Sequence, residues 1–154
     1  AEKKTMYEVP DFIKKSQAEG FSHFINDAGG SLCELEDQAL YKLLSEKSLI
    51  VYIQTNTENE RILIERAKTN PKPMYYNSHF FEKSINTYLA ENSLDYAAQV
   101  SPDDFVSWVF PKLIEDRLTK YTALANKYGC TIQSDDLHNC HSANDVINLI
   151  SSAL

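Results

Sequence analysis

Polar residues that suit ligand binding gather around the two adjacent glycines of "FINDAGGSL", residues 24–32. Asp27 carries a carboxylate, which binds magnesium directly or through water. Gly29 and Gly30 permit positive φ angles and let a ligand approach the backbone closely, and Ser31 adds a hydroxyl group. The stretch predicts a binding turn or, with about equal weight, an ordinary strand-to-helix turn with an incidental aspartate.

Three short β-like runs position these residues: "SHFINDA" (22–28), "SLIVYIQT" (48–55) and "CTIQSD" (130–135). The middle run is continuously apolar from Leu49 to Ile53, which is typical of a strand covered on both faces. Helical patterns separate the runs, which indicates crossovers between parallel strands. We therefore expect an α/β fold with a parallel sheet flanked by helices and about three strands in this chain. In such sheets ligands bind beyond the carboxyl ends of the strands, where Asp27 follows the first run.

Helix starts are marked by capping residues: Thr57 with Glu60, Ser101 before Pro102 and Asp104, and Ser142 with Asp145. Gly129 ends the long helical pattern that Pro102 opens, and Pro111 is expected to kink or divide it. Residues 70–100 are the least regular and are a candidate lid or insertion. We expect residues 1–154 to form a single domain.

The composition excludes several classes of function. The 22 acidic residues exceed the 15 basic ones, which gives a net charge of −7 and argues against binding to nucleic acid or anionic membranes. No apolar run approaches the roughly 20 residues that span a bilayer, and "AEKKTMYEVP" lacks the apolar stretch of a signal peptide. The three cysteines suit reduced thiols. These features predict a cytoplasmic protein.

Two cysteine patterns invite chemistry that we do not favour. Cys130, His138, Cys140 and His141 lie near one another, but their spacing does not match the paired ligands of a zinc site. Cys33 lies just inside the helix expected after the glycines, where a helix amino end lowers a thiol pKa. Burial of Cys33 as a small apolar residue is the more common arrangement.

A series of segments, in order, resembles the later half of the P-loop small-molecule kinases of the shikimate kinase and nucleoside monophosphate kinase kind: "FINDAGGSLCEL", "LIVYIQTNTENERILIERA", "NPKPMYY", "EDRLTKYTALANKYGCTIQSDD" and "ANDVINLISSAL". The chain is also similar to the C-terminal part of a bacterial family of ATPases, through "NDAGGSLCEL" and "SPDDFVSWVFP". The resemblance covers nearly the whole chain from about residue 7. It implies a three-layer P-loop-kinase-like fold, incomplete in this chain.

The resemblance also implies roles for residues of the glycine turn. Gly29, Gly30 and Ser31 fall where those kinases hold the acceptor substrate against a glycine loop. Asp27 falls near a Walker B-like acid, which implies a catalytic role and a magnesium ion bound to it.

Further site residues follow from the later segments. Arg66 and Lys72 fall in or beside the lid segment, and Arg117 falls where such kinases carry an arginine that contacts the ligand. Cationic groups there stabilise the charge of the transferred phosphoryl group. Ser134 and Asp135 fall in a loop that passes near the adenine. The alternatives are ordinary surface roles: helical ion pairs of Arg66 with Glu58 or Glu65, a pairing of Arg117 on the helix face of Asp116, and a solvated turn at Lys72.

The sequence departs from those kinases at one decisive point, because no G-x-x-x-x-G-K-[ST] motif occurs in the 154 residues. We therefore expect the C-terminal portion of a longer protein, whose missing N-terminal P-loop segment binds ATP and magnesium in the complete parent. This chain alone is expected to bind neither and to be inactive, and an exposed sheet edge would favour a homo-oligomer. The alternative is a non-catalytic protein-interaction module, in which the glycine turn is structural and the middle segment docks a partner.

Overall fold

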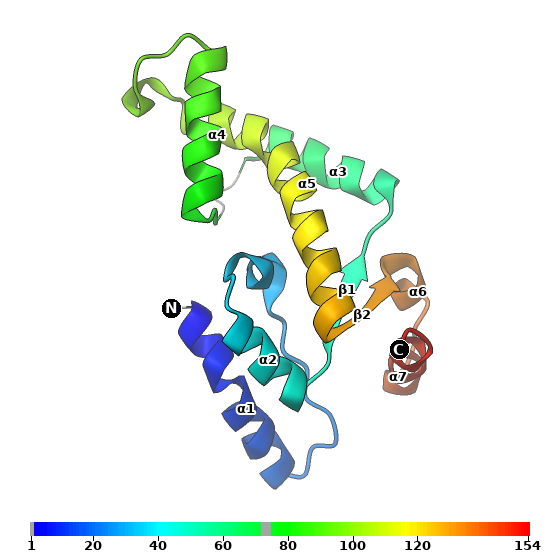
Figure 1. Cartoon of the computed structure of the whole chain (residues 1–154). Helices are drawn as coiled ribbons and strands as arrows, with labels where there is room; N and C mark the ends of the chain where they lie inside the picture. The colour runs from blue at the N-terminus through cyan, green and yellow to red at the C-terminus, as the bar shows by residue number, and fades with distance from the viewer. Residues whose placement is uncertain (1, 72–74) are drawn as a thin grey trace. The chain divides into compact units, whose positions relative to one another are not determined.

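The computed structural model describes residues 2–71 and 75–154, which divide into two compact units (Figure 1). The first unit comprises the residues up to Gln54 together with Lys120–Leu154, and the second comprises Thr55–Thr119. Helix α5, Pro102–Tyr128, contributes its residues up to Thr119 to the second unit and the rest to the first. Each unit has a hydrophobic core of its own.

Helices and a small sheet build the first unit. Besides the end of α5, its helices are α1 (Glu2–Ala18), the 3-10 helix η1 (Gly29–Glu34), α2 (Gln38–Lys47), α6 (Ser134–His138) and α7 (Ala143–Ser152). Its strands are β1 (Ile50–Gln54) and β2 (Gly129–Gln133). The second unit contains α3 (Thr57–Thr69), α4 (Ser78–Glu91), the 3-10 helix η2 (Ala97–Gln99) and most of α5.

Helices α1 and α2 lie side by side in the first unit and share one core (Figure 1). Met6 and Val9 are three residues apart, and Leu40 and Leu44 are four residues apart, which places each pair on one helical face. Leu40 has no exposed surface, so its burial stabilises the fold by roughly 1.5–3 kcal/mol. The spacing of apolar residues therefore explains how these two helices pack.

The two strands pair in parallel, with Ile50 opposite Gly129 and Gln54 opposite Gln133. Gly129 is required at its position because a Cβ atom there would lie 1.7 Å from the backbone oxygen of Ile50. The glycine that ends helix α5 thus also permits the first step of the strand pairing. Beyond Gln133 the chain turns directly into α6.

Aromatic side chains form the core of the second unit. Tyr88 of α4 packs edge to face on Phe105 and Trp108 of α5, with ring centroids 5.4 and 5.2 Å apart. Val109, one turn along α5 from Phe105, is fully buried in the same cluster. Edge-to-face pairs at such distances add stability beyond the burial of apolar area.

The expected three-layer parallel sheet of a P-loop-kinase-like α/β fold is wrong. The described residues are mostly helical, and their sheet has two strands instead of about three. The run at 48–55 contains β1, and the run at 130–135 overlaps β2 up to Gln133 before α6 begins, but residues 22–28 form no strand. Phe24 and Ile25 of residues 22–28 are exposed, and no strand of the described residues pairs with this segment. A β-like composition does not form a strand without a hydrogen-bonded partner.

The predicted helix boundaries agree closely with the structure. Helix α5 begins at Pro102, one residue after Ser101, and ends at Tyr128, just before Gly129. Pro111 does not divide it, since the helix is continuous. Ser142 caps α7 by accepting from the backbone nitrogen of Asp145 at 3.2 Å.

Helix α3 begins at Thr57, one residue earlier than a cap at Thr57 predicts, because its cap is Asn56, which accepts from the backbone nitrogen of Asn59 at 2.8 Å. Within residues 70–100, the candidate lid, α4 and η2 occupy much of the segment. None of the helices in the described ranges 2–71 and 75–154 is both long and apolar enough to cross a lipid bilayer.

Candidate functional site

The glycine turn has an exposed tip whose conformation depends on Gly29. Its φ angle of 57° lies in the left-handed region, which favours glycine. The Asp27 carboxylate accepts a hydrogen bond of 2.9 Å from the backbone nitrogen of Gly29, which closes the turn locally. Gly29 and Gly30 are the first two residues of the helix η1, and both are exposed to solvent. The first glycine therefore sets the turn, and Asp27 stabilises it.

The base of the turn is buried and hydrogen-bonded to α2. Leu32, Cys33 and Glu34 of η1 are all buried. The hydroxyl of Tyr41 on α2 donates to the backbone oxygen of Leu32 at 2.9 Å and accepts from the backbone nitrogen of Glu36 at 3.0 Å. Burial raises the pKa of Tyr41, so it stays a neutral hydrogen-bond donor over the physiological range. The turn therefore has an exposed tip at Gly29 and Gly30 and a buried base at Leu32, Cys33 and Glu34.

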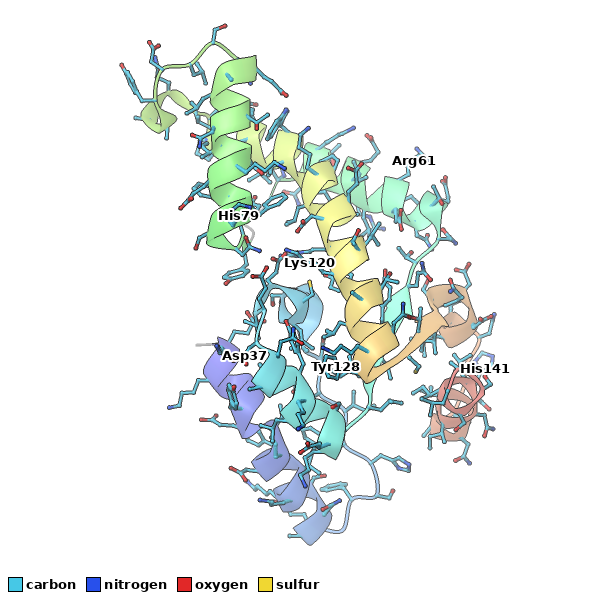
Figure 2. The ribbon with its side chains drawn as sticks, in the orientation of Figure 1. Asp37, Arg61, His79, Lys120, Tyr128 and His141 are labelled. Carbon is cyan, nitrogen blue, oxygen red and sulfur yellow. The ribbon has the colours of Figure 1, made fainter. Side chains whose placement is uncertain are left out.

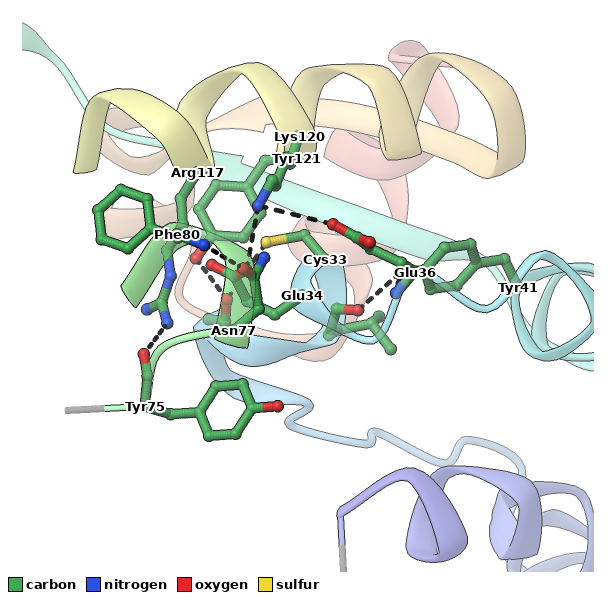
Figure 3. A network of polar contacts seen from close by, with 12 residues as sticks. Cys33, Glu34, Glu36, Tyr41, Tyr75, Asn77, Phe80, Arg117, Lys120 and Tyr121 are labelled. Carbon is green, nitrogen blue, oxygen red and sulfur yellow. Dashed lines mark hydrogen bonds and ion pairs between the residues drawn. The ribbon is translucent and has the colours of Figure 1, made fainter. Parts of the chain in front are cut away.

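The last turns of α5 hold the same segment from another side (Figure 3). Lys120 donates to the Glu34 carboxylate at 3.1 Å, and the side chain of Glu34 has no exposed surface. Glu36 lies 4.0 Å from the same ammonium group. The hydroxyl of Tyr121 donates to the backbone oxygen of Gly30 at 2.7 Å. A buried carboxylate needs such a partner, because an unpaired charge is costly to bury.

Contacts from α1 complete the support of this segment. Ser31 donates a hydrogen bond to Glu2. Asp37, labelled in Figure 2, caps α2 by accepting from the backbone nitrogen of Leu40 at 3.0 Å. Lys3 lies 2.6 Å from its carboxylate and Tyr7 donates to it at 3.0 Å. These hydrogen bonds, that from Lys3 above all, lower the pKa of Asp37 from 3.8 to about 2.

Two of the predicted site residues lie in the second unit, apart in sequence and environment. Arg66 is an exposed residue of α3, where the neighbouring acids Glu58 and Glu65 pair with Arg61 and Lys68. Arg117 of α5 is buried and donates to the backbone oxygen of Tyr75 at 2.9 Å (Figure 3). Lys72 lies outside the described residues.

Burial raises the pKa of Tyr76, which follows Tyr75, while the charge of Arg117 works in the opposite direction and is the smaller effect. The hydroxyl of Tyr76 is buried and has no hydrogen-bond partner within the described ranges. Through its hydrogen bond to the backbone oxygen of Tyr75, Arg117 fixes the start of the segment that leads into α4. Its catalytic role, like that of Arg66, stays a prediction.

Ser134 and Asp135 begin helix α6, directly after strand β2. The Ser134 hydroxyl is buried without a hydrogen-bond partner among the described residues, so a ligand would reach it only after a local movement of the chain. Asp135 is exposed, and its backbone oxygen accepts from the side chain of Asn139 at 3.0 Å. The predicted contact of both residues with adenine stays a prediction.

Metal ligands do not gather in the part of the chain that the structure describes. No group of three or more His, Cys, Asp or Glu side chains there is arranged to hold an ion. All three cysteines are free, and burial raises the pKa of Cys130. Asp27 offers a single carboxylate, which suits a magnesium ion that takes its other ligands from water and phosphate. A magnesium ion at Asp27 stays a prediction.

Sequence reasoning missed Glu34, Lys120 and Tyr121 as members of this site. Glu34 and Lys120 stand 86 positions apart, and no spacing rule connects them. Tyr121 belongs to the apolar face of the α5 pattern, which indicates packing and gives no sign of its hydrogen bond. A weak signal existed for the acid, since Glu34 lies between the apolar residues Cys33 and Leu35, and a buried carboxylate requires a cation.

A comparison of the chain with protein-family models, with curated proteins and with solved structures finds no match in any of the three. The candidate site therefore rests on the contacts of the residues themselves.

Proposed function

We propose that this chain is the acceptor-binding part of an ATP-dependent small-molecule kinase or ATPase, and that the glycine turn, Asp27–Ser31, contacts the acceptor. The observation that carries the proposal is the exposed tip of this turn on a buried base. Binding sites commonly use such loops, because a rigid scaffold holds the backbone and the polar groups of the tip in place. Reduced cysteines suit a cytoplasmic location for this enzyme.

The cofactors of the proposed reaction are ATP and magnesium. The residues present fit a part of them: the Asp27 carboxylate is a suitable magnesium ligand, and the exposed Asp135 is a suitable contact for a base, whereas the Ser134 hydroxyl beside it is buried. Magnesium would neutralise charge on the phosphates. The backbone cradle for those phosphates is absent from the sequence, so a further polypeptide segment has to supply it.

Substitutions in the turn test this proposal in the complete gene product. We expect Asp27→Asn to lower kcat for ATP-dependent turnover at least tenfold, because the amide binds magnesium more weakly than a carboxylate does. Gly29→Ala should raise KM for the acceptor through distortion of the tip. Gly20→Ala is the matched control, since Gly20 has a φ angle of 88° but lies outside the turn. Equal kinetics for the Asp27→Asn variant and the unaltered protein would refute the proposal.

The alternative is a non-catalytic interaction module, and exposed apolar side chains favour it. Phe21 is 61% exposed and Ile25 is 89% exposed, with Phe24 between them, directly before the turn. Such residues typically mark contact surfaces. The coding sequence ahead of residue 1 separates the two: an in-frame phosphate-binding loop favours the enzyme, and an initiator codon directly ahead favours the module. Sedimentation velocity tests whether the chain also self-associates, as an open sheet edge would favour.

A further inference from the structure

An open pocket of about 200 Å³ lies between α2 and the last turns of α5, within the first unit. We call it the α2–α5 pocket. Cys33, Tyr41 and Gln38 line it on one side, and Lys120, Lys127 and Tyr128 line it on the other, with Ala123 and Leu124 between them. This volume is more than ten times the roughly 10–15 Å³ that one water needs, so the pocket has room for several waters or one small ligand.

The charged side chains that line the pocket are all basic. Lys120 and Lys127 contribute two ammonium groups, and no carboxylate lines the pocket in the described part of the chain. This is unusual in a protein of net charge −7. Glu34 and Glu36 offset the charge of Lys120 from outside the lining, at 3.1 and 4.0 Å. Lys127 has no such acid beside it within the described ranges, so a positive charge faces the pocket.

The donors of the pocket outnumber its acceptors. Lys127 and the hydroxyl of Tyr128 both donate to the side-chain oxygen of Gln38, each at 2.9 Å. Two donors thus share one neutral amide oxygen. An ammonium group has three hydrogens, so Lys127 keeps donors for a ligand. A ligand that brings several anionic oxygens would satisfy this arrangement better than water does.

Apolar groups complete the lining. Tyr41 and Tyr128 lie with ring centroids 6.0 Å apart, and Leu124 packs against the same core. A phosphoryl group has three acceptor oxygens and carries up to two negative charges, which matches the two ammonium groups of the lining more closely than a single carboxylate would.

We propose that the α2–α5 pocket binds the phosphoryl group of a small molecule. Lys127 donates its remaining hydrogens to the oxygens of this group, Lys120 adds charge, and the apolar wall at Leu124 receives any organic body. The pocket is separate from the acceptor site proposed at Asp27–Ser31, so either assignment can fail without the other.

Amide NMR titration of the 154-residue chain tests this at constant ionic strength, with inorganic phosphate and phenyl phosphate as separate probes. We expect saturable shifts at Gln38, Ala123 and Tyr128 with at least one probe. Binding of inorganic phosphate alone would assign the site to the free ion, and tighter binding of phenyl phosphate would assign it to an organic phosphate. Phenol, which has the ring without the charge, should leave these amides unshifted.

Substitution of Lys127 is the second part of the experiment. Lys127→Met should weaken binding about tenfold or more, since a charge-assisted hydrogen bond contributes over 1.4 kcal/mol. Lys47→Met, an exposed change of the same charge on α2 outside the pocket, should leave the affinity unchanged. Lys127 is exposed, so its loss should not unfold the chain, and circular dichroism checks this. Equal weakening by both variants, tight binding of phenol, or no saturable shift would overturn the proposal.

Discussion

Gly29 is the residue on which the shape of the glycine turn depends. Its φ angle of 57° costs an L-residue about 1–2 kcal/mol, while open space surrounds the position of a Cβ atom there. The cost of substitution is therefore one of backbone conformation and not of collision. We predict that Gly29→Ala lowers the free energy of unfolding by about 1–2 kcal/mol in urea titrations.

Asparagine provides the internal control at the same position, because it adopts the left-handed conformation more readily than alanine does. Gly29→Asn should thus retain most of the stability that Gly29→Ala loses. Equal losses for the two variants would show that side-chain volume, not φ, decides.

Asp37 makes the stability of the first unit depend on pH. Its pKa is lowered to about 2, so the carboxylate stabilises the folded state above the ordinary value of 3.8, and this contribution is lost as the pH falls from 3.8 toward 2. We predict that Asp37→Asn destabilises the protein at pH 6 and that the difference from the unaltered protein shrinks by pH 2. Urea titrations across this range measure it.

Asparagine is a good helix cap, so Asp37→Asn removes the charge while it retains the cap of α2. The pH dependence of the difference then reports the carboxylate with its partners Lys3 and Tyr7. Lys3→Gln should remove part of the same dependence. A difference that stays constant from pH 6 to pH 2 would contradict the assignment.

At the scale of the elements, the sequence predicted helices better than the sheet. Helix ends depend on local residues such as Ser101, Pro102 and Gly129, which act within one turn and can be recognised from spacing alone. A strand depends on a partner that is distant in sequence. Residues 22–28 have the composition of a strand, but no partner pairs with them in the described residues, and composition cannot reveal that.

The candidate site was predictable to a similar, limited degree. The turn at Gly29 could be recognised because adjacent glycines are a local signal, and the structure gives Gly29 a positive φ. Its support could not be predicted, since β1, the second unit and most of α5 lie between Glu34 and Lys120 in the sequence. A pairing of this kind depends on tertiary packing, which periodicity does not encode.

Gly129 joins helix α5 to the sheet and is sensitive to any side chain. A Cβ atom there would lie 1.7 Å from the Ile50 oxygen, far below van der Waals contact, so β1 and β2 would have to move apart. We predict that Gly129→Ala lowers the free energy of unfolding by more than about 3 kcal/mol and abolishes the protection of the strand amides in hydrogen exchange.

Gly20→Ala is the control for this variant. Nothing lies within 4 Å of a Cβ atom at Gly20, so only backbone strain opposes the change. The amides of β1 and β2 should keep their protection in that variant. Retained protection in Gly129→Ala would mean that the strands tolerate another register than Ile50 opposite Gly129.

For the whole molecule, the central question is whether one or two cooperative units unfold. The core around Leu40 and the core around Val109 share no buried residue, which favours partly independent opening. Helix α5 belongs to both units, and its continuous hydrogen bonding favours a single transition. The separate cores involve far more buried apolar surface than the few helical hydrogen bonds at the boundary, so we expect two transitions.

Val109→Ala tests this expectation, because it removes two buried carbon atoms from the core of the second unit alone and should cost about 2 kcal/mol. Native-state hydrogen exchange should then show protection factors about 30-fold lower in α4, with α1 and α2 unchanged. Leu40→Ala, an equally buried site in the first unit, should give the reverse pattern. If either variant lowers protection by the same factor in all these helices, the chain unfolds as one cooperative unit, and the two cores are coupled through α5.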